Sequence, residues 1–520
     1  MTPVPPDLSG DGAPAAGAAA ESRRYIRGSS LLLVGRIISV LLNFVVQVVT
    51  VRYLSKGDYG AFAYGIGVAS LGASVVLLGF GKGIPRLVPI YNERRDYPRA
   101  VGAVALASGT IWGLGISLMV ALYLFRDAVA GGARVDPGTL SLLLVLIALA
   151  PLDAFDNLLQ HVVAVFCSPR TIFIRRHLLG PGLKLTAVLL VLLVSGDAYM
   201  LAYGYLAGSL IGLSVLVVVL LRSWKKQGLL GYLRPGRWRL PVREVFGFSL
   251  PLMSTDLSVA LRTSFMVIML EYFWSPPAVA DYRAVLPVAT LNMIVFEAFG
   301  FLFVPLASRM FARNDIKGIG DLYWRTSLWI AVLTFPVFAA TCLLAPTITV
   351  LFFGQRYQQA ATLLAILAVG HYFNAALGFN AATLRALGKV RIIVLSDAVT
   401  AAAAVVLGFV LIRRYGALGA AFATTGTLVL QNVFNHVGLA VGRTGIRLLA
   451  WQYVQVYLLI ALVSAALGGT QWLLRPPAYV TAVLAAAACL VVIRFSRHSV
   501  DPRTNFPELL RIPALRWLLA

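Results

Sequence analysis

Long apolar runs, separated by short polar segments, recur along almost the whole chain. About 20 mostly apolar residues are enough for a helix to cross the hydrocarbon core of a bilayer, and fourteen such stretches can be marked between Ser29 and Arg494. The predicted spans are 29–51, 60–81, 100–125, 138–161, 177–195, 199–221, 245–270, 281–306, 326–345, 361–384, 391–412, 417–441, 452–474 and 478–494. The pattern therefore predicts an all-α integral membrane protein of about 14 transmembrane helices.

Composition agrees with this prediction. Of the 520 residues, 59% are apolar and 12% are charged, whereas soluble domains contain about 25% charged residues. Residues 1–22 contain no apolar run and are predicted to be a disordered tail rather than a signal peptide. The cysteines, Cys167, Cys342 and Cys489, lie far apart in the sequence, so neither a disulfide nor a metal site is expected.

The net charge of +23 is open to two interpretations, nucleic-acid binding or membrane topology. If the N-terminus is placed in the cytoplasm, 32 of the 44 Lys and Arg residues fall in cytoplasmic segments, 8 fall on the opposite side and 4 lie within spans. Because cytoplasmic loops are enriched in basic residues, the bias predicts a multi-pass protein of the cytoplasmic (inner) membrane with both termini in the cytoplasm. The basic segment 222–243 is interpreted as a topology signal that contacts anionic lipid headgroups, and no nucleic-acid partner is expected.

A weak internal repeat divides the chain. The segment that follows the first span is similar to the segment that follows the seventh: VRYLSKGDYGAFAYG and LEYFWSPPAVADYRA. The paired positions are 218 to 221 residues apart: Tyr53 with Tyr272, Pro85 with Pro305, Arg170 with Arg391 and Gly208 with Gly426. Apart from chance similarity between apolar helices, this indicates two six-helix lobes in a parallel pseudo-twofold repeat, with a substrate path between them and two additional C-terminal helices.

These features predict the following organisation: a disordered cytoplasmic tail (1–22), an N-lobe (23–221), a basic cytoplasmic linker (222–243), a C-lobe (244–443), two further spans (444–496) and a cytoplasmic C-terminal tail (497–520). No loop is long enough to contain a soluble catalytic domain. The protein is therefore not expected to be an enzyme, and no cofactor is expected.

Charged residues within the predicted spans are the functional candidates, because a charge at mid-bilayer costs about 2.5 to 3.5 kcal/mol even on lenient scales. The basic candidates could bind a diphosphate in one central cavity or could extend from helix ends towards the headgroups. They are Arg36, Lys184, Arg262 and Arg283.

Acidic and amide side chains provide a second group of candidates. Asp256 and Asp397 could bind a coupling Na+ or H+, or could form ion pairs that stabilise the lobes. The same two interpretations apply to Asp153, Asp156 and Glu297. Amides such as Asn43 could contact a sugar or could link neighbouring helices.

The sequence also resembles a known family. The N-terminal part of this chain is similar to the opening of the polysaccharide and O-antigen flippases, in the segments RGSSLLLVGRIISVLLNFVVQVVTVRYLSKGDYGAFAYGIGVASL and LGFGKGIPRL. These flippases belong to the multidrug, oligosaccharidyl-lipid and polysaccharide exporter superfamily. A later segment resembles the ninth-to-tenth-helix region of that family: LFFGQRYQQAATLLAILAVGHYFNAALGFNAATLRALGKVR. The resemblance implies two lobes in a V around a cationic cavity, with an undecaprenyl-diphosphate-type substrate that is flipped outward.

The resemblance also implies roles for individual residues. Arg36 and Arg283 match functional arginines of the related lipid II flippases, whereas the second arginine of helix one is missing and Asn43 lies nearby. Asp256 and Asp397 lie on the helices that bind sodium in some members.

The expected function is transport of a polyprenyl-diphosphate-linked oligosaccharide to the outer leaflet for cell-surface polysaccharide synthesis, with membrane lipids and other polysaccharide-assembly proteins as further partners. The alternatives are a drug or cation antiporter, a lipid II flippase, and a membrane glycosyltransferase or polymerase.

Overall fold

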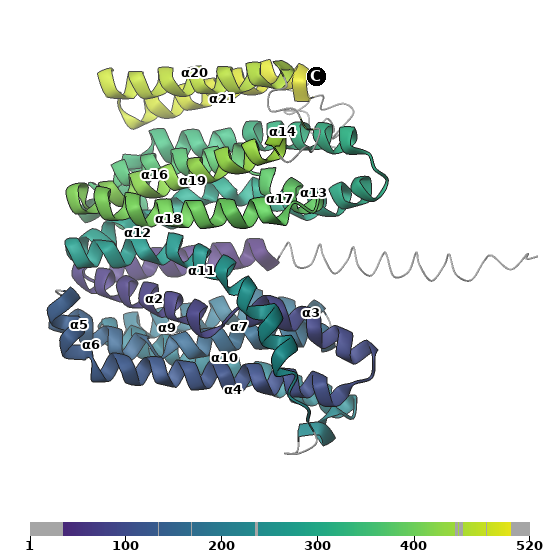
Figure 1. Ribbon diagram of the computed structural model, residues 1–520. Coiled ribbons are helices and arrows are strands. Elements are labelled where there is room, and N and C mark those ends of the chain that lie inside the picture. The colour runs from purple at the N-terminus through teal and green to yellow at the C-terminus, as the bar shows by residue number, and fades with distance from the viewer. Residues whose placement is uncertain are drawn as a thin grey trace, which may run out of the picture.

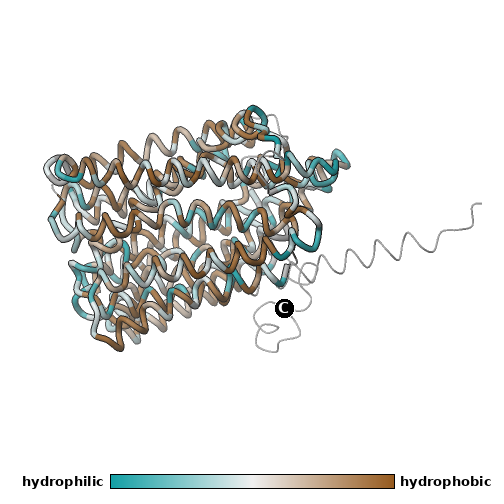
Figure 2. The backbone as a smooth tube through the Cα atoms, turned by 90° about the horizontal axis from the view of Figure 1, so that it is seen from below, coloured by the Kyte–Doolittle hydropathy of each residue, from teal (hydrophilic) through white to brown (hydrophobic). Residues whose placement is uncertain are grey.

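The computed structural model describes residues 35–133, 135–167, 169–233, 238–441, 446, 451–474 and 476–500. Within these ranges the regular elements are all helical, and fourteen segments are long and apolar enough to cross a membrane. The predicted all-α class and the predicted number of spans are therefore confirmed. Figure 2 shows largely hydrophobic middle sections with hydrophilic ends. The predicted tails, 1–22 and most of 497–520, lie outside the described residues.

The first half of the bundle contains the first span, Gly35–Tyr53, and the helices that follow it up to the linker. These are α2 (Lys56–Val76), α3 (Phe80–Glu93), α4 (Tyr97–Leu124), α5 (Arg126–Ala133), α6 (Pro137–Leu146), α7 (Leu149–Phe166), α8 (Pro169–Phe173), the π-helix η1 (Ile174–Leu179), α9 (Gly180–Val194), α10 (Ala198–Lys226) and the 3₁₀ turn η2 (Leu229–Leu233).

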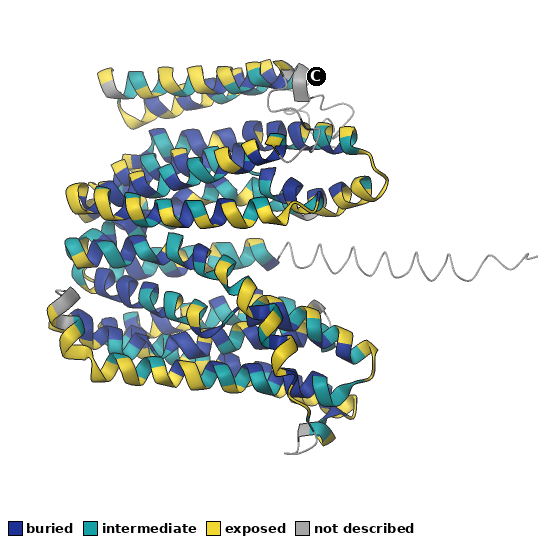
Figure 3. Ribbon diagram, in the orientation of Figure 1, coloured by how far each residue is buried: buried dark blue, intermediate teal, exposed yellow. Residues whose placement is uncertain are grey.

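The second half contains α11 (Val242–Phe273), α12 (Pro276–Thr290), η3 (Leu291–Met293), α13 (Ile294–Ala312), α14 (Ile316–Leu343), α15 (Ala345–Phe353), η4 (Gln355–Tyr357), α16 (Ala360–Ala376), α17 (Asn380–Ala386), α18 (Val390–Tyr415) and α19 (Ala417–Val441). Two last helices, α20 (Trp451–Leu474) and α21 (Ala478–Val500), pack against α14 and form the outer edge of the bundle (Figure 1). Figure 3 shows that their outward faces are exposed.

Helix boundaries repeat between the two halves. Helices α4 and α14 begin at Tyr97 and Ile316, 219 positions apart, and both have 28 residues. The short helices that follow them, α5 and α15, begin at Arg126 and Ala345, again 219 positions apart. The structure therefore repeats with the period of the weak sequence repeat.

The apolar core is shared between the halves at only one end of the bundle. One cluster of buried side chains combines residues of both halves, such as Tyr59 and Leu143 with Val279 and Phe353. This is the far end, on the left in Figure 1, where α2 and α12 begin. Towards the opposite or basic end, where the first span begins and the linker lies, each half has a separate core. The two lobes are thus joined at the far end and diverge towards the basic end.

Close backbone contact and paired charges seal the far end. A Cβ atom at Gly60 of α2 would lie 1.8 Å from the carbonyl oxygen of Pro276, so only glycine permits this approach to α12. Lys56 Nζ lies 2.7 Å from Asp281 Oδ1 across the same junction. Beside it, Arg52 Nε donates to the carbonyl oxygen of Phe352 at 2.8 Å, and Arg356 donates to the carbonyl oxygen of Arg52 at 2.8 Å. We call this contact between the lobes the far-end seam.

Helix α11 crosses from one lobe to the other. Val245 near its start belongs to the core of the first half, whereas Met266 and Leu270 near its end belong to the shared core. Gly79, with φ of +74°, separates α2 from α3 and lies so close to α11 that a Cβ there would be 2.2 Å from the Ser249 carbonyl oxygen. One lateral side between the lobes is therefore closed by α3 and α11.

The seam predicts that Gly60→Ala separates the lobes at the far end, because ordinary non-bonded contact needs about 3.5 Å. Spin labels at the exposed residues Tyr123 and Leu418, in a background without the three natural cysteines, should shift towards longer distances by about 2 Å or more.

Gly57→Ala is the matched control, since the nearest atom to a Cβ there is Ser55 Oγ at 3.9 Å. An unchanged distance distribution in the Gly60→Ala variant would show that the seam does not depend on this contact.

Candidate functional site

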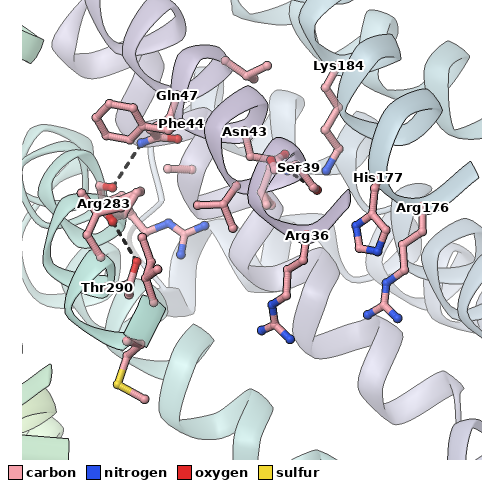
Figure 4. A pocket seen from close by; sticks show the side chains of 18 of the residues that line it. Arg36, Ser39, Asn43, Phe44, Gln47, Arg176, His177, Lys184, Arg283 and Thr290 are labelled. Atoms are coloured by element: carbon pink, nitrogen blue, oxygen red, sulfur yellow. Dashed lines mark hydrogen bonds between the residues drawn. The ribbon is translucent and has the colours of Figure 1, made fainter. Parts of the chain in front are cut away.

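A cavity of about 800 Å³ lies between the lobes on the basic side of the seam. Its walls come from the first span, α2, the segment from α8 to α10, and α12 to α13. The polar and charged residues that line it are Arg36, Ser39, Asn43, Gln47, Tyr59, Arg176, His177, Lys184, Tyr205, Arg283, Thr290 and Glu297. Among the predicted site residues, the structure brings Arg36, Asn43, Lys184 and Arg283 together here (Figure 4).

The first span contributes one polar face to this cavity. Arg36, Ser39, Asn43 and Gln47 are three or four positions apart, so their side chains lie on the same side of the helix. Asn43 Nδ2 donates to the Ser39 carbonyl oxygen at 2.7 Å, which holds the amide against its own helix. A single polar stripe on an otherwise apolar helix thus faces the interior rather than lipid.

An ion pair joins the lobes at the edge of the cavity. Arg36 Nη2 lies 2.6 Å from Glu297 Oε1 on α13, and the two side chains are 43% and 37% exposed. A pair this accessible contributes little to stability. The pair also means that Glu297, the only carboxylate among the described residues that line the cavity, already has a cationic partner.

Arg283 is positioned by a proline one turn later in α12. In an α-helix the N–H of residue 287 would donate to the carbonyl of residue 283, but Pro287 has no N–H. The freed Arg283 carbonyl oxygen instead accepts a hydrogen bond from Gln47 Nε2 of the first span at 3.2 Å (Figure 4). Gln47 also donates to the Tyr59 hydroxyl. The guanidinium of Arg283 forms no ion pair with any residue that the structure describes.

The fifth span contributes further basic groups. Lys184 lies on α9, with Nζ 5.6 Å from the centre of the Tyr205 ring. Arg176 and His177 lie on the π-helix η1, a type of helix turn often found at functional sites. Neither residue was among the predicted site residues, and the predicted start of this span at residue 177 left Arg176 outside it. The structure corrects that boundary, since the span runs over Arg170–Val194.

The early start of the fifth span has a physical reason. Arg170, Arg175 and Arg176, together with the glycines and proline that follow, resemble a polar loop in the sequence. In the structure the Arg175 side chain is only 10% exposed and forms an ion pair with Asp156 of α7. A helix can therefore contain Arg175 within the membrane because its charge is compensated by another helix.

Three predicted site residues lie outside this cavity, within ion pairs. Arg262 Nη2 of α11 lies 3.9 Å from Asp397 Oδ1 of α18, and the same Asp397 oxygen accepts a hydrogen bond from Gln431 at 2.9 Å. Asp256 Oδ1 lies 2.7 Å from Lys82 Nζ of α3. The prediction that Asp256 and Asp397 bind a coupling Na+ or H+ stays a prediction, and either ion would compete there with a basic side chain.

Comparison with known proteins identifies a family and several similar transporters. A family model described as "Polysaccharide biosynthesis protein" matches residues 25–311. The lipid II flippase MurJ of Bacillus subtilis (strain 168) is 22% identical over 509 residues, 87% of this chain and 89% of its own. A structure of the lipid II flippase MurJ in an inward closed conformation has a TM-score of 0.68 at 13% identity, covering 90% of this chain and 99% of that one.

A second solved structure, an inward-facing transporter of the multidrug resistance MATE family, has a TM-score of 0.61 at 16% identity, covering 78% of this chain and 94% of that one. The helical bundle and these matches define a multi-pass membrane transporter of the multidrug, oligosaccharidyl-lipid and polysaccharide exporter superfamily. Within it, this chain belongs to the family of polysaccharide biosynthesis proteins, whose model covers more than half of its residues. The resemblance seen in the sequence is confirmed, and the transporter class of the relatives agrees with the expectation of a non-enzymatic protein.

The Arg262–Asp397 contact predicts that Arg262→Met lowers stability by about 3 kcal/mol, because it leaves a largely buried carboxylate without its cation. The double variant Arg262→Met with Asp397→Asn should recover much of this loss. Thermal unfolding in detergent, with and without Na+ at constant ionic strength, measures both effects. An Arg262→Met variant as stable as the wild type, together with Na+-dependent wild-type stability, would favour an ion site over an ion pair.

Proposed function

We propose that this transporter moves a polyprenyl-diphosphate-linked oligosaccharide from the cytoplasmic to the outer leaflet. The observation that supports this most directly is the charge of the cavity between the lobes. Four basic residues line it from both lobes: Arg36, Arg176, Lys184 and Arg283. Glu297 is the only carboxylate among the described lining residues, and it is paired with Arg36. Arginine forks and a lysine ammonium are suited to phosphate oxygens.

In the proposed mechanism the basic end faces the cytoplasm, as the distribution of Lys and Arg in the sequence predicts. The diphosphate enters the cavity at Arg36 and Arg283, and the lipid tail remains in the bilayer beside the exposed Arg36–Glu297 pair. The far-end seam then opens while the basic end closes. No covalent bond is made or broken, and an ion gradient or the membrane potential supplies direction.

The antiporter alternative receives less support from the site. A pocket that selects cationic drugs needs unpaired carboxylates. Among the described lining residues of the 800 Å³ cavity, the single carboxylate, Glu297, has a basic partner. A membrane glycosyltransferase or polymerase is likewise disfavoured, because the relatives are transporters and flippases.

Lipid II transport remains a second candidate function, favoured by the match with the Bacillus subtilis lipid II flippase over most of both chains. The family model instead favours a polysaccharide precursor. Both substrates would be lipid-linked diphosphates, so the cationic cavity supports either one and does not discriminate between them.

The diphosphate role of the cavity predicts that Arg283→Ala abolishes transport. In a strain that lacks the gene, a complete lipid-linked oligosaccharide should accumulate on the cytoplasmic face of the membrane. Extraction of lipid-linked intermediates combined with a leaflet-accessibility assay measures this. Wild-type protein should clear the lipid, Arg283→Ala should not, and Arg313→Ala, which removes an exposed arginine outside the cavity, should behave as wild type.

A normal lipid pool in the deletion strain, or full transport by Arg283→Ala, would contradict the proposal. The lipid II alternative predicts a different result in a second assay. Expression of this protein in cells depleted of their own lipid II flippase would then restore growth, whereas an oligosaccharide flippase leaves those cells inviable.

A further inference from the structure

A smaller side chamber of about 290 Å³ opens from the cavity into the first lobe. It lies among the first span, α7, the segment from η1 to α9, and α10. Five residues line both spaces and therefore form their common boundary: Ser39, Asn43, Arg176, Lys184 and Tyr205. Its volume is close to the lower limit of small-ligand pockets, about 300 Å³.

The side chamber is polar on almost every side. Pro181 and Leu183 are the only apolar side chains larger than glycine among its described lining residues. Helix α7 contributes a stripe of four polar groups at positions 153, 156, 157 and 160, with the spacing of one helix face. Polar surface of this extent within a membrane bundle marks a site that binds water or a polar ligand.

Arg175 and Asp156, which line the side chamber, are held in place by an ion pair and hydrogen bonds. Arg175 forms an ion pair with Asp156 Oδ1, and its Nε donates to the Gly212 carbonyl oxygen at 3.0 Å. Gln160 Nε2 donates to the second oxygen of Asp156 at 2.5 Å. Both Asp156 oxygens therefore have a partner, and this acid holds Arg175 and Gln160 in place.

Asp153, one turn earlier on α7, is in a different situation. Its side chain is exposed to the side chamber, and it forms no hydrogen bond or ion pair with any residue that the structure describes. An ionised carboxylate is an acceptor only, so it is suited to hydroxyl or amino donors. Asn157, Ser209 and the Tyr205 hydroxyl provide further groups for hydrogen bonding to the same space.

We infer that the side chamber binds an uncharged or amino-bearing sugar unit of the transported glycan, while the cationic cavity holds the diphosphate. This rests on the proposed function. Asp153, the lining carboxylate without an ion-pair partner among the described residues, disfavours an anion beside it, whereas a polyol can donate to Asp153 and accept from amides. The common boundary at Lys184 and Arg176 places basic groups where a sugar would join a diphosphate.

Binding to the full-length protein in nanodiscs tests this inference. The two probes are the lipid-linked oligosaccharide that accumulates in the deletion strain, and undecaprenyl diphosphate without sugar. Asp153→Ala should weaken binding of the glycan-bearing lipid by about three- to tenfold, the effect of a lost hydrogen bond, and leave undecaprenyl diphosphate unchanged. Asp153→Asn, which can still accept from a hydroxyl, should retain most of the affinity.

Further variants separate this effect from misfolding and from diphosphate binding. Gly208 of α10 lines the side chamber, and a Cβ there meets nothing closer than Leu183 Cβ at 3.5 Å. Gly208→Leu should therefore fold and occupy the space, removing the preference for the glycan-bearing lipid. Arg283→Ala should weaken both lipids. Asp127→Ala, at a residue whose side chain is 93% exposed outside both spaces, is the matched control.

The inference fails if Asp153→Ala and Gly208→Leu change the affinity of both lipids equally, or of neither. It also fails if Asp153→Asn abolishes Na+- or proton-dependent transport but leaves the glycan preference intact, since the side chamber would then be an ion site. Wild-type protein that binds neither lipid, or a deletion strain without accumulated lipid, would instead contradict the proposed function itself.

Discussion

A charged side chain in the hydrocarbon core must face a partner or water, because leaving it exposed to lipid costs several kcal/mol. This constraint explains where the intramembrane charges of this transporter lie. Some are paired with a charge on another helix: Arg175 with Asp156, Arg262 with Asp397 and Lys82 with Asp256. Three basic side chains without an ion-pair partner among the described residues, Arg176, Lys184 and Arg283, face the cavity between the lobes. Basic charge therefore remains available for a ligand in this cavity.

The far-end seam determines where that cavity can be. At that end the lobes share one apolar core, and towards the basic end each has its own. A space between the lobes can consequently open only on the basic side. Gln47 connects the two regions, since its amide contacts the Tyr59 hydroxyl within the shared core and the Arg283 carbonyl oxygen at the cavity. Movement at the seam would therefore change the position of a basic group in the site.

Sequence reasoning predicted the number of spans, the repeat and three of the basic lining residues, Arg36, Lys184 and Arg283, because isolated charges in apolar runs are conspicuous. It missed Arg176, since consecutive basic residues before Gly180 resemble a loop unless the compensating Asp156 is known. It also could not tell that Arg262 faces Asp397, 135 positions away. Pairing between distant helices leaves no local pattern, and the side chamber depends on such pairing.

The charge balance of the cavity bears on how substrate and lobe movement would be coupled. Arg36, Arg176 and Lys184 come from the first lobe and Arg283 from the second, so their mutual repulsion opposes closure of the empty cavity. Glu297 reduces this electrostatic repulsion only at Arg36, with which it forms an ion pair. A diphosphate between the lobes would neutralise the remaining repulsion and contact both sides at once, and a ligand shifts a conformational equilibrium only through such differential contacts. Under the proposed function, closure at the basic end is thus favoured only when the anion is bound, which disfavours unproductive cycling of the empty transporter.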